Sequence, residues 1–444
     1  MAVLGIETSC DDTSIAIVRD RRCLALATQS SVDEHAAWGG IVPELAARQH
    51  ILAIGPVLEQ ALADAGLELA EIDAIAATYG PGLAGSLLVG YNFGQGLAAR
   101  LGIPLWPVNH LAAHAHACWL DLSPGDEPQF PAICLLVSGG HSELTVMHGP
   151  GDHRLLGRTR DDAVGEAFDK AARIMGLGFP GGPAIQAAAE QARATGLEPY
   201  RLPRPRLPDS LDFSLAGIKS AIGRARAGKL GPHERGQIFG ASDPAEFERA
   251  SPDSIGRMAA GLEDAIADML IKNTLLAARR YSARSVLLCG GVAANLRLRS
   301  RLSAESPLKV HVPDFAYCVD NGAMVAISGD MSGWSAGAFP DIDPGLKLPG
   351  PNPASRLRSG FRARWLPRSR RRYQKPAIRI RAPPLDCRSG SRKPDNRPGS
   401  RGPAISRPTR VRTACSNESP SGTVYAGCRC GRRRPPPGTA LAPF

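Results

Sequence analysis

The chain has 444 residues, of which 43% are hydrophobic, so it can form two or three domains with substantial cores. Its formal net charge of +11 is unevenly distributed, because residues 344–444 hold 24 of the 53 basic residues and 3 of the 42 acidic ones, which leaves 29 basic and 39 acidic residues in 1–343. We expect neither a membrane span nor a signal peptide, because apolar runs stay below roughly 18 residues and Glu7 and Asp11 precede any apolar region.

The first predicted element is a pair of β-strands at residues 3–18, joined by a tight polar turn that carries Asp11 and Asp12. A turn of small hydroxyl and acidic residues can bring backbone N–H groups and carboxylates against a phosphate or its metal. For a single hairpin, an ordinary surface turn is the alternative interpretation.

Residues 35–50 form a loop that enters a helix extending to about Ala65, and a strand follows at 72–79. Residues 80–85 then place three glycines between a strand and a helix, as a dinucleotide-binding turn does. We reject a nicotinamide site, because Pro81 removes a backbone donor and no acidic residue follows about 20 positions later. The glycines are instead expected to permit close packing at a strand-to-helix turn.

A helix is predicted within residues 107–116, where Asn109 is a plausible N-cap and two histidines, His110 and His114, stand four residues apart. Because successive helical residues turn by about 100°, both histidines project from one face and can bind one metal ion, whereas His116 points elsewhere. A pair of surface or partly buried histidines without a metal is the alternative.

A metal site needs a third ligand from another part of the chain. The best candidate is Asp320, which lies in a polar cluster that interrupts apolar sequence at residues 317–324. Two imidazoles and one carboxylate leave coordination positions open, which suits iron(II) or zinc acting on a substrate rather than a closed structural site.

A polar, proline-containing linker at 121–128 precedes a second pair of strands, 132–146, around a glycine turn. This pair repeats the opening motif, and two such hairpins facing each other across a cleft are typical of actin, the sugar kinases and the heat-shock ATPases. We therefore predict an α/β, two-lobed fold of the actin-like ATPase class. The predicted divisions are a first lobe, 1–122; a second lobe with the substrate site, 130–310; a segment with the metal aspartate and a helix returning to the first lobe, 311–343; and a tail, 344–444.

Further elements of the second lobe are a helix entered at 161–170 and ending near Gly176, a glycine-rich turn at 178–183, a region of proline, arginine and glycine at 201–241, a long amphipathic helix at about 254–280 and a buried strand at 285–289. After that strand, the pair Gly290-Gly291 lets a flat base or ribose approach the backbone and Asn295 can hydrogen-bond it, unless this is a simple β–α turn. A final helix from Gly322 to about Gly329 is expected to cross back to the first lobe.

Residues 344–444 contain 17 of the 38 prolines, and arginine far outnumbers lysine there, so we expect a disordered basic tail. This tail is either an electrostatic arm for nucleic acid or the out-of-frame translation of a GC-rich gene, and we favour the second interpretation. Six cysteines are scattered singly through 1–343, as expected for reduced thiols of a cytoplasmic protein.

Taken together, these motifs resemble the tRNA N6-adenosine threonylcarbamoyltransferase family, the bacterial TsaD, YgjD or Gcp proteins. The resemblance covers roughly residues 1–340 in order, and no single motif would support it alone. The matching stretches are Gly5–Asp11, Gly39–Ala46, Leu136–His141, Gly165–Lys170, Gly290–Val292 with Asn295, and Asp320–Met324.

The resemblance implies transfer of a threonylcarbamoyl group from threonylcarbamoyl-adenylate to the N6 amine of the adenosine 3′ of the anticodon, in tRNAs that read codons beginning with A. It also implies that His110, His114 and Asp320 bind one metal, usually iron(II) and sometimes zinc. The substrate contacts that it implies are Leu136, Val137, Ser138, Gly139, Gly140, Asp169, Gly182 and Asn295. We add Asp11 as the residue that orients or deprotonates the incoming amine.

Because residues 1–343 are acidic, we expect the chain to need help in holding tRNA. The family resemblance suggests TsaB-like and TsaE-like partner proteins, with a separate synthase that supplies the adenylate. Two departures from the family are Asp12, where a glutamate is usual, and the long tail, where a short basic segment usually ends the chain.

The sequence leaves three alternative functions to consider. A metalloprotease is disfavoured, because Leu111 stands beside the first histidine where zinc proteases of the common kind place a glutamate general base. A kinase or ATPase is suggested by the fold alone. A non-catalytic assembly subunit is disfavoured because the chain retains both histidines and Asp320.

Overall fold

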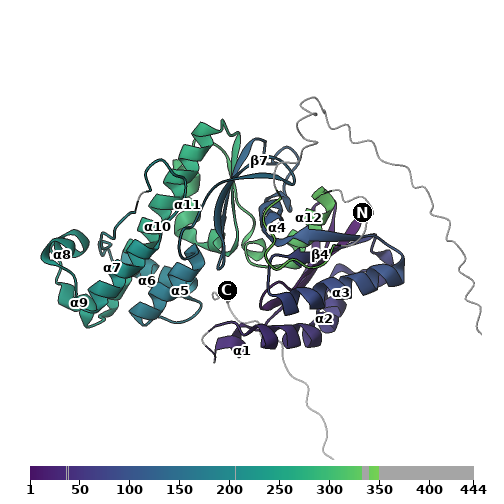
Figure 1. The fold of residues 1–444 in the computed structure, drawn as a ribbon, viewed down its shortest axis with the longest axis horizontal. Coiled ribbons are helices and arrows are strands. Elements are labelled where there is room, and N and C mark those ends of the chain that lie inside the picture. Colours follow the sequence, from purple (N-terminus) through teal and green to yellow (C-terminus); the bar gives the residue numbers. More distant parts are fainter. Residues whose placement is uncertain (37, 39, 206, 333–339, 350–444) are drawn as a thin grey trace, which may run out of the picture. The chain divides into compact units, whose positions relative to one another are not determined.

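The structure, a computed structural model, describes residues 1–36, 38, 40–205, 207–332 and 340–349 (Figure 1). Most of the predicted tail, residues 350–444, lies outside the described residues. The described part contains two five-stranded sheets, and helices pack on each of them.

The first sheet has the strand order β3-β2-β1-β4-β5, in which β1, β2 and β3 pair antiparallel and β1, β4 and β5 pair parallel. Its strands are β1 (Ala2–Glu7), β2 (Asp12–Arg19), β3 (Arg22–Ser30), β4 (Ala74–Gly80) and β5 (Leu105–Asn109). Its helices are α1 (Val32–Ala36), α2 (Pro43–Ala65), α3 (Ala84–Leu101), α4 (His110–His116) and α12 (Gly322–Ser332).

Helices cover both faces of this sheet, and the side chains of β1 alternate between the two faces. Leu4 and Ile6 belong to the hydrophobic cluster that contains α2, whereas Val3 belongs to the cluster that contains α4 and α12. Successive side chains of a strand point to opposite faces, so a strand buried on both sides is apolar throughout. The helices α2 and α3 therefore cover one face of the first sheet, and α4 and α12 cover the other.

The second sheet has the strand order β10-β9-β6-β7-β8, with β6, β7 and β8 antiparallel and β6, β9 and β10 parallel. Its strands are β6 (Ala132–Val137), β7 (Ser142–Gly149), β8 (Asp152–Arg158), β9 (Ser285–Cys289) and β10 (Val310–His311). The helices of this part are α5 (Val164–Met175), α6 (Gly181–Ala194), α7 (Ala216–Arg226), α8 (Pro232–Phe239), α9 (Pro244–Glu248), α10 (Pro252–Arg280) and α11 (Leu296–Glu305).

The two sheets share one topology. In each, the first strand in sequence is central, the next two follow on one side in antiparallel pairs, and the last two follow on the other side in parallel pairs. This duplicated arrangement confirms the predicted two-lobed, actin-like ATPase fold. Both predicted hairpins are present, as β1–β2 and as β6–β7.

The last described helix, α12, returns to the first lobe as predicted and packs on β1, β2, β4 and α4. The approach is close because glycines face each other: a Cβ atom at Gly5 would overlap the carbonyl oxygen of Gly322 and lie 2.6 Å from the backbone nitrogen of Ala326. The side chain of Ser14 on β2 accepts a hydrogen bond from the Gly322 N–H at 3.0 Å. The start of α12 is therefore fixed directly against the backbone of the central strand.

The region 201–241, for which the sequence analysis predicted no helix, contains α7 and α8. The buried residues of α7 are Ile218, Ala221, Ile222 and Ala225, which follow the spacing of one helical face. This signal was present in the sequence, but arginines and glycines between the apolar positions obscured it.

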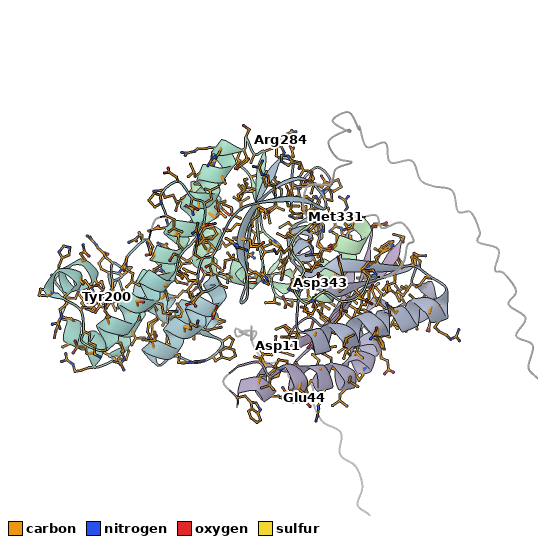
Figure 2. The ribbon with its side chains drawn as sticks, viewed as in Figure 1. Asp11, Glu44, Tyr200, Arg284, Met331 and Asp343 are labelled. Carbon is orange, nitrogen blue, oxygen red and sulfur yellow. The ribbon has the colours of Figure 1, made fainter. Side chains whose placement is uncertain are left out.

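Residues 343–349, a segment that we call the strap, run from the first lobe to the edge strand of the second. The N–H of Asp343, labelled in Figure 2, donates to the Tyr79 carbonyl at 2.8 Å, and the Gly82 N–H donates to the Pro344 carbonyl at 3.3 Å. At the other end, the His153 N–H on β8 donates to the Pro349 carbonyl at 3.2 Å. Residues 344–349, assigned to the tail from the sequence, therefore pack with the folded part.

Two further expectations from the sequence concerned membrane-spanning helices and the state of the cysteines. No helix among the described residues is long and apolar enough to span a bilayer. The six cysteines of the described part are free thiols, including Cys134 and Cys289 on neighbouring strands, whose sulfur atoms lie 3.5 Å apart.

The close approach of α12 to β1 predicts opposite effects for two glycine-to-alanine substitutions. Gly5→Ala should destabilise the protein by about 3 kcal/mol, because the new methyl group meets backbone atoms that cannot rotate away. Gly55→Ala, in the middle of α2 with open space around the Cβ position, should stabilise it by about 0.5–1 kcal/mol. Urea denaturation of the two variants and the wild type measures both shifts, and a Gly5→Ala protein of wild-type stability would contradict the described packing.

The buried ring of His153 predicts a loss of stability in weak acid. Burial lowers the pKa of His153 to about 4, while the nearby Asp152 opposes this shift, and neither ring nitrogen has a hydrogen-bond partner in the described residues. Below the ordinary pKa of 6.5 the unfolded chain binds a proton that the folded chain binds only near pH 4, so the free energy of unfolding falls as pH decreases through this window. Between pH 7 and pH 5 the loss should be on the order of 2 kcal/mol.

His153→Leu should remove this part of the pH dependence, whereas His233→Leu, at an exposed position on α8, should keep it. Denaturation curves at pH 7, 6 and 5 test the prediction, which is wrong if the His153 variant keeps the wild-type slope.

Candidate metal centre and adjoining site

The predicted histidine helix begins directly at the end of a strand. The helix α4 starts at His110, where β5 ends at Asn109. The side-chain oxygen of Asn109 accepts hydrogen bonds from the Leu111 N–H at 2.9 Å and the Ala112 N–H at 3.1 Å, which confirms the predicted N-cap. Its amide nitrogen donates to the Lys347 carbonyl at 2.8 Å, so the same side chain also holds the strap.

The structure brings His110, His114 and Asp320 together, although Asp320 is about 200 positions away in the sequence. The Asp320 Oδ1 atom lies 3.1 Å from His114 Nε2 and 3.6 Å from His110 Nε2. One ligand atom from each residue can be chosen so that all three lie within 4.8 Å of one another. The two imidazole rings meet edge to face, with centroids 4.7 Å apart. His116 is directed elsewhere, since its Nδ1 lies 2.9 Å from the Ser328 hydroxyl of α12.

A second carboxylate, Glu7 at the end of β1, orients the first histidine. Its Oε2 atom lies 3.0 Å from His110 Nδ1 and accepts a hydrogen bond from the Thr78 hydroxyl at 2.7 Å. The other oxygen accepts from the Ser9 N–H at 2.5 Å, so the buried carboxylate is fully engaged. A carboxylate bonded to one imidazole nitrogen directs the other nitrogen toward a metal. This role of Glu7 was not predicted from the sequence, where its only signal is an acid at the end of a buried strand.

The charges of this cluster depend on one another. Burial lowers the pKa of His110, but the carboxylates of Asp320 and Glu7 outweigh burial and raise it to about 9. Burial raises the pKa of Asp320, but His110 and His114 outweigh it and hold the pKa well below its usual range. Two carboxylates thus flank a buried imidazole, and a divalent cation held between His110, His114 and Asp320 would balance their negative charge.

The unpaired nitrogens of His114 agree with a metal site. The residue is 1% exposed, and neither ring nitrogen makes a hydrogen bond within the described residues. Its Nε2 approaches Asp320 closely, but without the alignment of a hydrogen bond. A buried imidazole is costly without a partner, so a nitrogen aimed at a carboxylate and a second imidazole fits a metal ligand.

The predicted substrate turn follows β6. Leu136 and Val137 are core residues of the strand, whereas Gly139 and Gly140 are exposed. The turn is closed by the Ser138 N–H, which donates to the His141 carbonyl at 2.8 Å, and by the Gly165 N–H of α5, which donates to the Ser138 carbonyl at 3.1 Å. Any contact that Leu136 and Val137 make with a ligand is therefore through their backbone.

The remaining predicted contacts hold the second lobe together. The Asp169 carboxylate accepts a hydrogen bond from the Gly181 N–H at 2.7 Å, and Gly182 is the second residue of α6. Asn295 caps α11 by accepting from the Leu298 N–H at 2.9 Å. Its amide nitrogen donates to the buried Glu263 carboxylate at 2.7 Å and to the Gln186 side-chain oxygen at 3.2 Å. The two N–H bonds of the amide are thus committed, and a ligand can meet Asn295 only at its oxygen.

Asp11 lies on the turn between β1 and β2 (Figure 2). Its carbonyl accepts hydrogen bonds from the Ser31 N–H at 3.2 Å and the Ser31 hydroxyl at 2.7 Å. The buried His50 of α2 supports this turn, with Nε2 3.1 Å from the Cys10 carbonyl and Nδ1 2.8 Å from the Thr13 hydroxyl. Burial raises the pKa of the neighbouring Asp12 to about 6, while a hydrogen bond from Ser30 opposes the shift.

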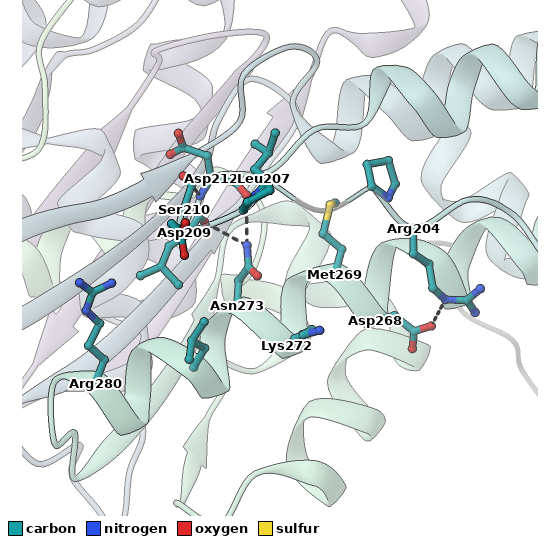
Figure 3. Close-up of a pocket in the computed structure, with 14 residues that line it drawn as sticks. Arg204, Leu207, Asp209, Ser210, Asp212, Asp268, Met269, Lys272, Asn273 and Arg280 are labelled. Carbon is teal, nitrogen blue, oxygen red and sulfur yellow. Dashed lines mark hydrogen bonds and ion pairs between the residues drawn. The ribbon is translucent and has the colours of Figure 1, made fainter.

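Two cavities of similar volume differ in their relation to this site. One, of about 770 Å³, lies beside the metal centre and is lined by Leu111 of α4, by Gly140 and His141 of the turn and by the strap. The other, of about 840 Å³, lies between residues 204–205 and 207–212 on one side and α10 on the other (Figure 3). There the Asn273 amide donates to two backbone carbonyls at 3.1 Å, and Arg204 pairs with Asp268. The second cavity contains none of the predicted site residues.

Residues 22–327 match the family model described as TsaD, tRNA N6-adenosine threonylcarbamoyltransferase. The chain belongs to this family. A tRNA N6-adenosine threonylcarbamoyltransferase of Thermomicrobium roseum is 52% identical over 334 residues, which are 73% of this chain and 90% of that protein. A protein of the same name from Dehalococcoides mccartyi is 45% identical over 352 residues, which are 78% of this chain and 99% of that protein.

Among solved structures, component A of the Acidaminococcus fermentans (R)-2-hydroxyglutaryl-CoA dehydratase matches with a TM-score of 0.43 and 15% identity, covering 75% of this chain and 99% of that chain. The family match ends at residue 327, so residues 344–444 lie beyond it.

Substitution of a residue in the His110, His114 and Asp320 cluster should abolish metal binding. His114→Ala and Asp320→Ala should lose stoichiometric metal, whereas Glu7→Gln should keep the site but weaken metal affinity about 10–100-fold, because its role is to orient His110. Metal content by inductively coupled plasma mass spectrometry and competition with a chelator measure both effects. His233→Ala, remote on α8, is the control, and full metal content in the Asp320 variant would contradict the assignment.

Proposed function

We propose that this chain transfers a threonylcarbamoyl group from threonylcarbamoyl-adenylate to the N6 amine of the adenosine 3′ of the anticodon, in tRNAs that read codons beginning with A. The observation that carries the proposal is the meeting of His110, His114 and Asp320 at one point, in a chain that belongs to the threonylcarbamoyltransferase family. Such a reaction takes place where tRNA is found, so we expect the chain to act in the cytoplasm.

The chemistry needs no covalent nucleophile, because an acyl-adenylate is already activated. The tasks of the protein are to hold the donor, polarise the carbonyl that is attacked and position a weakly nucleophilic aromatic amine. A divalent metal held by His110, His114 and Asp320 would supply Lewis-acid polarisation. We propose iron(II) for this metal, with zinc as the alternative, since open sites with two histidines and one carboxylate suit both.

The donor is proposed to lie along the exposed turn Ser138–Gly140 and the starts of α6 and α11. Gly139 and Gly140 have open space around their Cβ positions, so a phosphate or ribose can approach their backbone. Gly182 has the same open space at the start of α6. Asn295 would accept a hydrogen bond from a ligand hydroxyl or amine, because its own N–H bonds are committed to Glu263 and Gln186.

Asp11 is proposed to orient the incoming amine or accept its proton. It stands on the turn that directly follows the strand bearing Glu7, so the carboxylate that orients His110 and the proposed acceptor contact share one strand end. His50 and Ser31 fix the backbone of that turn, which keeps the Asp11 side chain on a rigid support.

The proposed division of labour follows the two sheets, with residues 1–122 providing the metal histidines and Asp11, residues 130–310 providing the donor contacts, and residues 311–343 returning Asp320 to the first lobe. TsaB-like and TsaE-like partners are proposed because residues 1–343 carry 29 basic against 39 acidic residues, a poor charge balance for holding tRNA alone.

The activity has a direct test. Unmodified tRNA is incubated with the metal-loaded full chain, the donor and the proposed partners, and threonylcarbamoyladenosine is measured by mass spectrometry after digestion to nucleosides. His110→Ala/His114→Ala should reduce product by about 100-fold or more, because Lewis-acid stabilisation is lost. The control is His233→Ala, and equal modification by the double variant and the wild type would refute the role of the metal.

A further inference from the structure

The 770 Å³ cavity beside the metal centre has walls from both lobes. Its lining includes Pro81 and Gly82 after β4, Leu111 next to the first metal ligand, the edge strands β7 and β8, and the strap. Of the predicted site residues, Gly140 alone lines it. The cavity therefore adjoins the reaction centre but lies mainly outside the proposed donor contacts.

The cavity presents positive charge in a folded part that is otherwise acidic. Three cationic side chains line it, Arg158 and Arg160 of β8 and its end, and Lys347 of the strap. Arg160 is neutralised by Asp212, with Nε 2.6 Å from Oδ2. Within the described residues, Arg158 and Lys347 make no side-chain ion pair, so both remain available to an anion.

One acidic side chain opposes them. Glu143 on β7 stands opposite Arg158 in the strand register. Burial raises the pKa of Glu143, while Arg158 opposes this shift. Arg160 and Asp212 neutralise each other. The charged side chains that remain in the lining are Arg158, Lys347 and Glu143, so the net charge of the cavity is positive.

Both cationic positions are held by backbone contacts. The Arg158 N–H donates to the Asp212 carboxylate at 3.0 Å, and the Lys347 carbonyl accepts from the Asn109 amide at 2.8 Å. Asn109 is also the N-cap of the histidine helix, so the backbone of Lys347 is fixed relative to the metal ligands. The backbone at both positions is thus held in place, and the exposed side chains extend from it into the cavity.

The turn Ser138–His141 separates this cavity from the α5 side of the second lobe. On that side, Gly165 packs against the turn so tightly that a Cβ atom there would lie 2.8 Å from the Gly139 Cα. On the other side, Gly140 and His141 open into the cavity. A donor held on the turn would leave the cavity as an approach to the metal centre for the second substrate.

We propose that this cavity binds a backbone phosphate of the acceptor RNA, with Arg158 and Lys347 as the phosphate contacts. This inference rests on the proposed function, because it assigns the phosphate to the acceptor rather than to the adenylate donor. Charge complementarity supports it, since arginine and lysine are the usual partners of RNA phosphates. Contacts of this kind position the nucleic acid without reading its sequence.

The experiment uses charge reversal in the metal-loaded full chain, assembled with the proposed TsaB-like and TsaE-like partners. Arg158→Glu and Lys347→Glu should each weaken binding of unmodified tRNA by about tenfold near 0.15 M salt. Each should also reduce the slope of log Kd against log salt concentration by about 1, the change expected when one phosphate contact is lost. The KM for the adenylate donor should stay within about twofold of the wild-type value.

Lys272→Glu is the matched control, because Lys272 lines the other cavity, of about 840 Å³, which holds no predicted site residue (Figure 3). The tail is present in every variant, so its basic residues contribute equally to all the binding curves. Wild-type tRNA affinity and an unchanged salt slope in both cavity variants would overturn the inference. An equal loss in the Lys272 variant, or an effect confined to the donor KM, would overturn it as well.

The outcome is separable from that of the proposed function. If the wild type forms no threonylcarbamoyladenosine, the proposed function fails, while the tRNA binding curves still decide whether the cavity holds an RNA phosphate. If the wild type modifies tRNA and the cavity variants bind it normally, the inference fails and the proposed function stands.

Discussion

The site depends on the contact between the backbone of β1 and the start of α12. Asp320 lies two residues before that helix, so it can reach the histidines of α4 only if α12 lies directly on the central strand of the first sheet. Gly5 and Gly322 make that approach possible, because a side chain at either position would overlap backbone atoms. A packing constraint in the core thus sets the distance between proposed metal ligands that are about 200 residues apart in the sequence.

The end of β1 also supports the candidate site. Glu7 terminates β1 and meets His110, and the turn that follows holds Asp11 and is supported by His50. Strand, turn and helix therefore act as one rigid unit, in which a shift of β1 would move His110, a proposed metal ligand, together with the proposed acceptor contact. A comparable arrangement exists in the second lobe, where the buried Glu263 fixes Asn295 at the start of α11.

Much of this arrangement could be predicted from sequence because it depends on local patterns. The spacing of His110 and His114, the cap at Asn109 and the two glycine-containing hairpins are all short-range features, and the structure confirms the helix, the cap and the hairpins. Asp320 was found because a polar cluster interrupted apolar sequence. The roles of Glu7 and Glu263 could not be predicted, because a buried carboxylate is recognisable only when its partners, distant in sequence, are known.

The helices α7 and α8 and the strap were missed for a different reason. Arginine, glycine and proline dominate the composition of both regions, and composition outweighed the periodic apolar positions that would have marked α7. The strap buries little beyond Leu348, which packs partly buried against the core, and backbone hydrogen bonds to Tyr79, Gly82 and His153 hold its two ends. Such bonds leave almost no trace in a sequence.

The double role of Asn109 couples two events that would otherwise be independent. Its oxygen closes the first turn of the histidine helix while its nitrogen holds the strap, so detachment of the strap would leave one amide proton unsatisfied and loosen the cap at the same time. Fraying at the start of α4 and opening of the cavity that the strap lines should therefore occur together. The backbone amides of both segments should then show one common hydrogen-exchange rate. Access to the cavity and the order of the proposed metal ligands on α4 are in this way governed by one amide group.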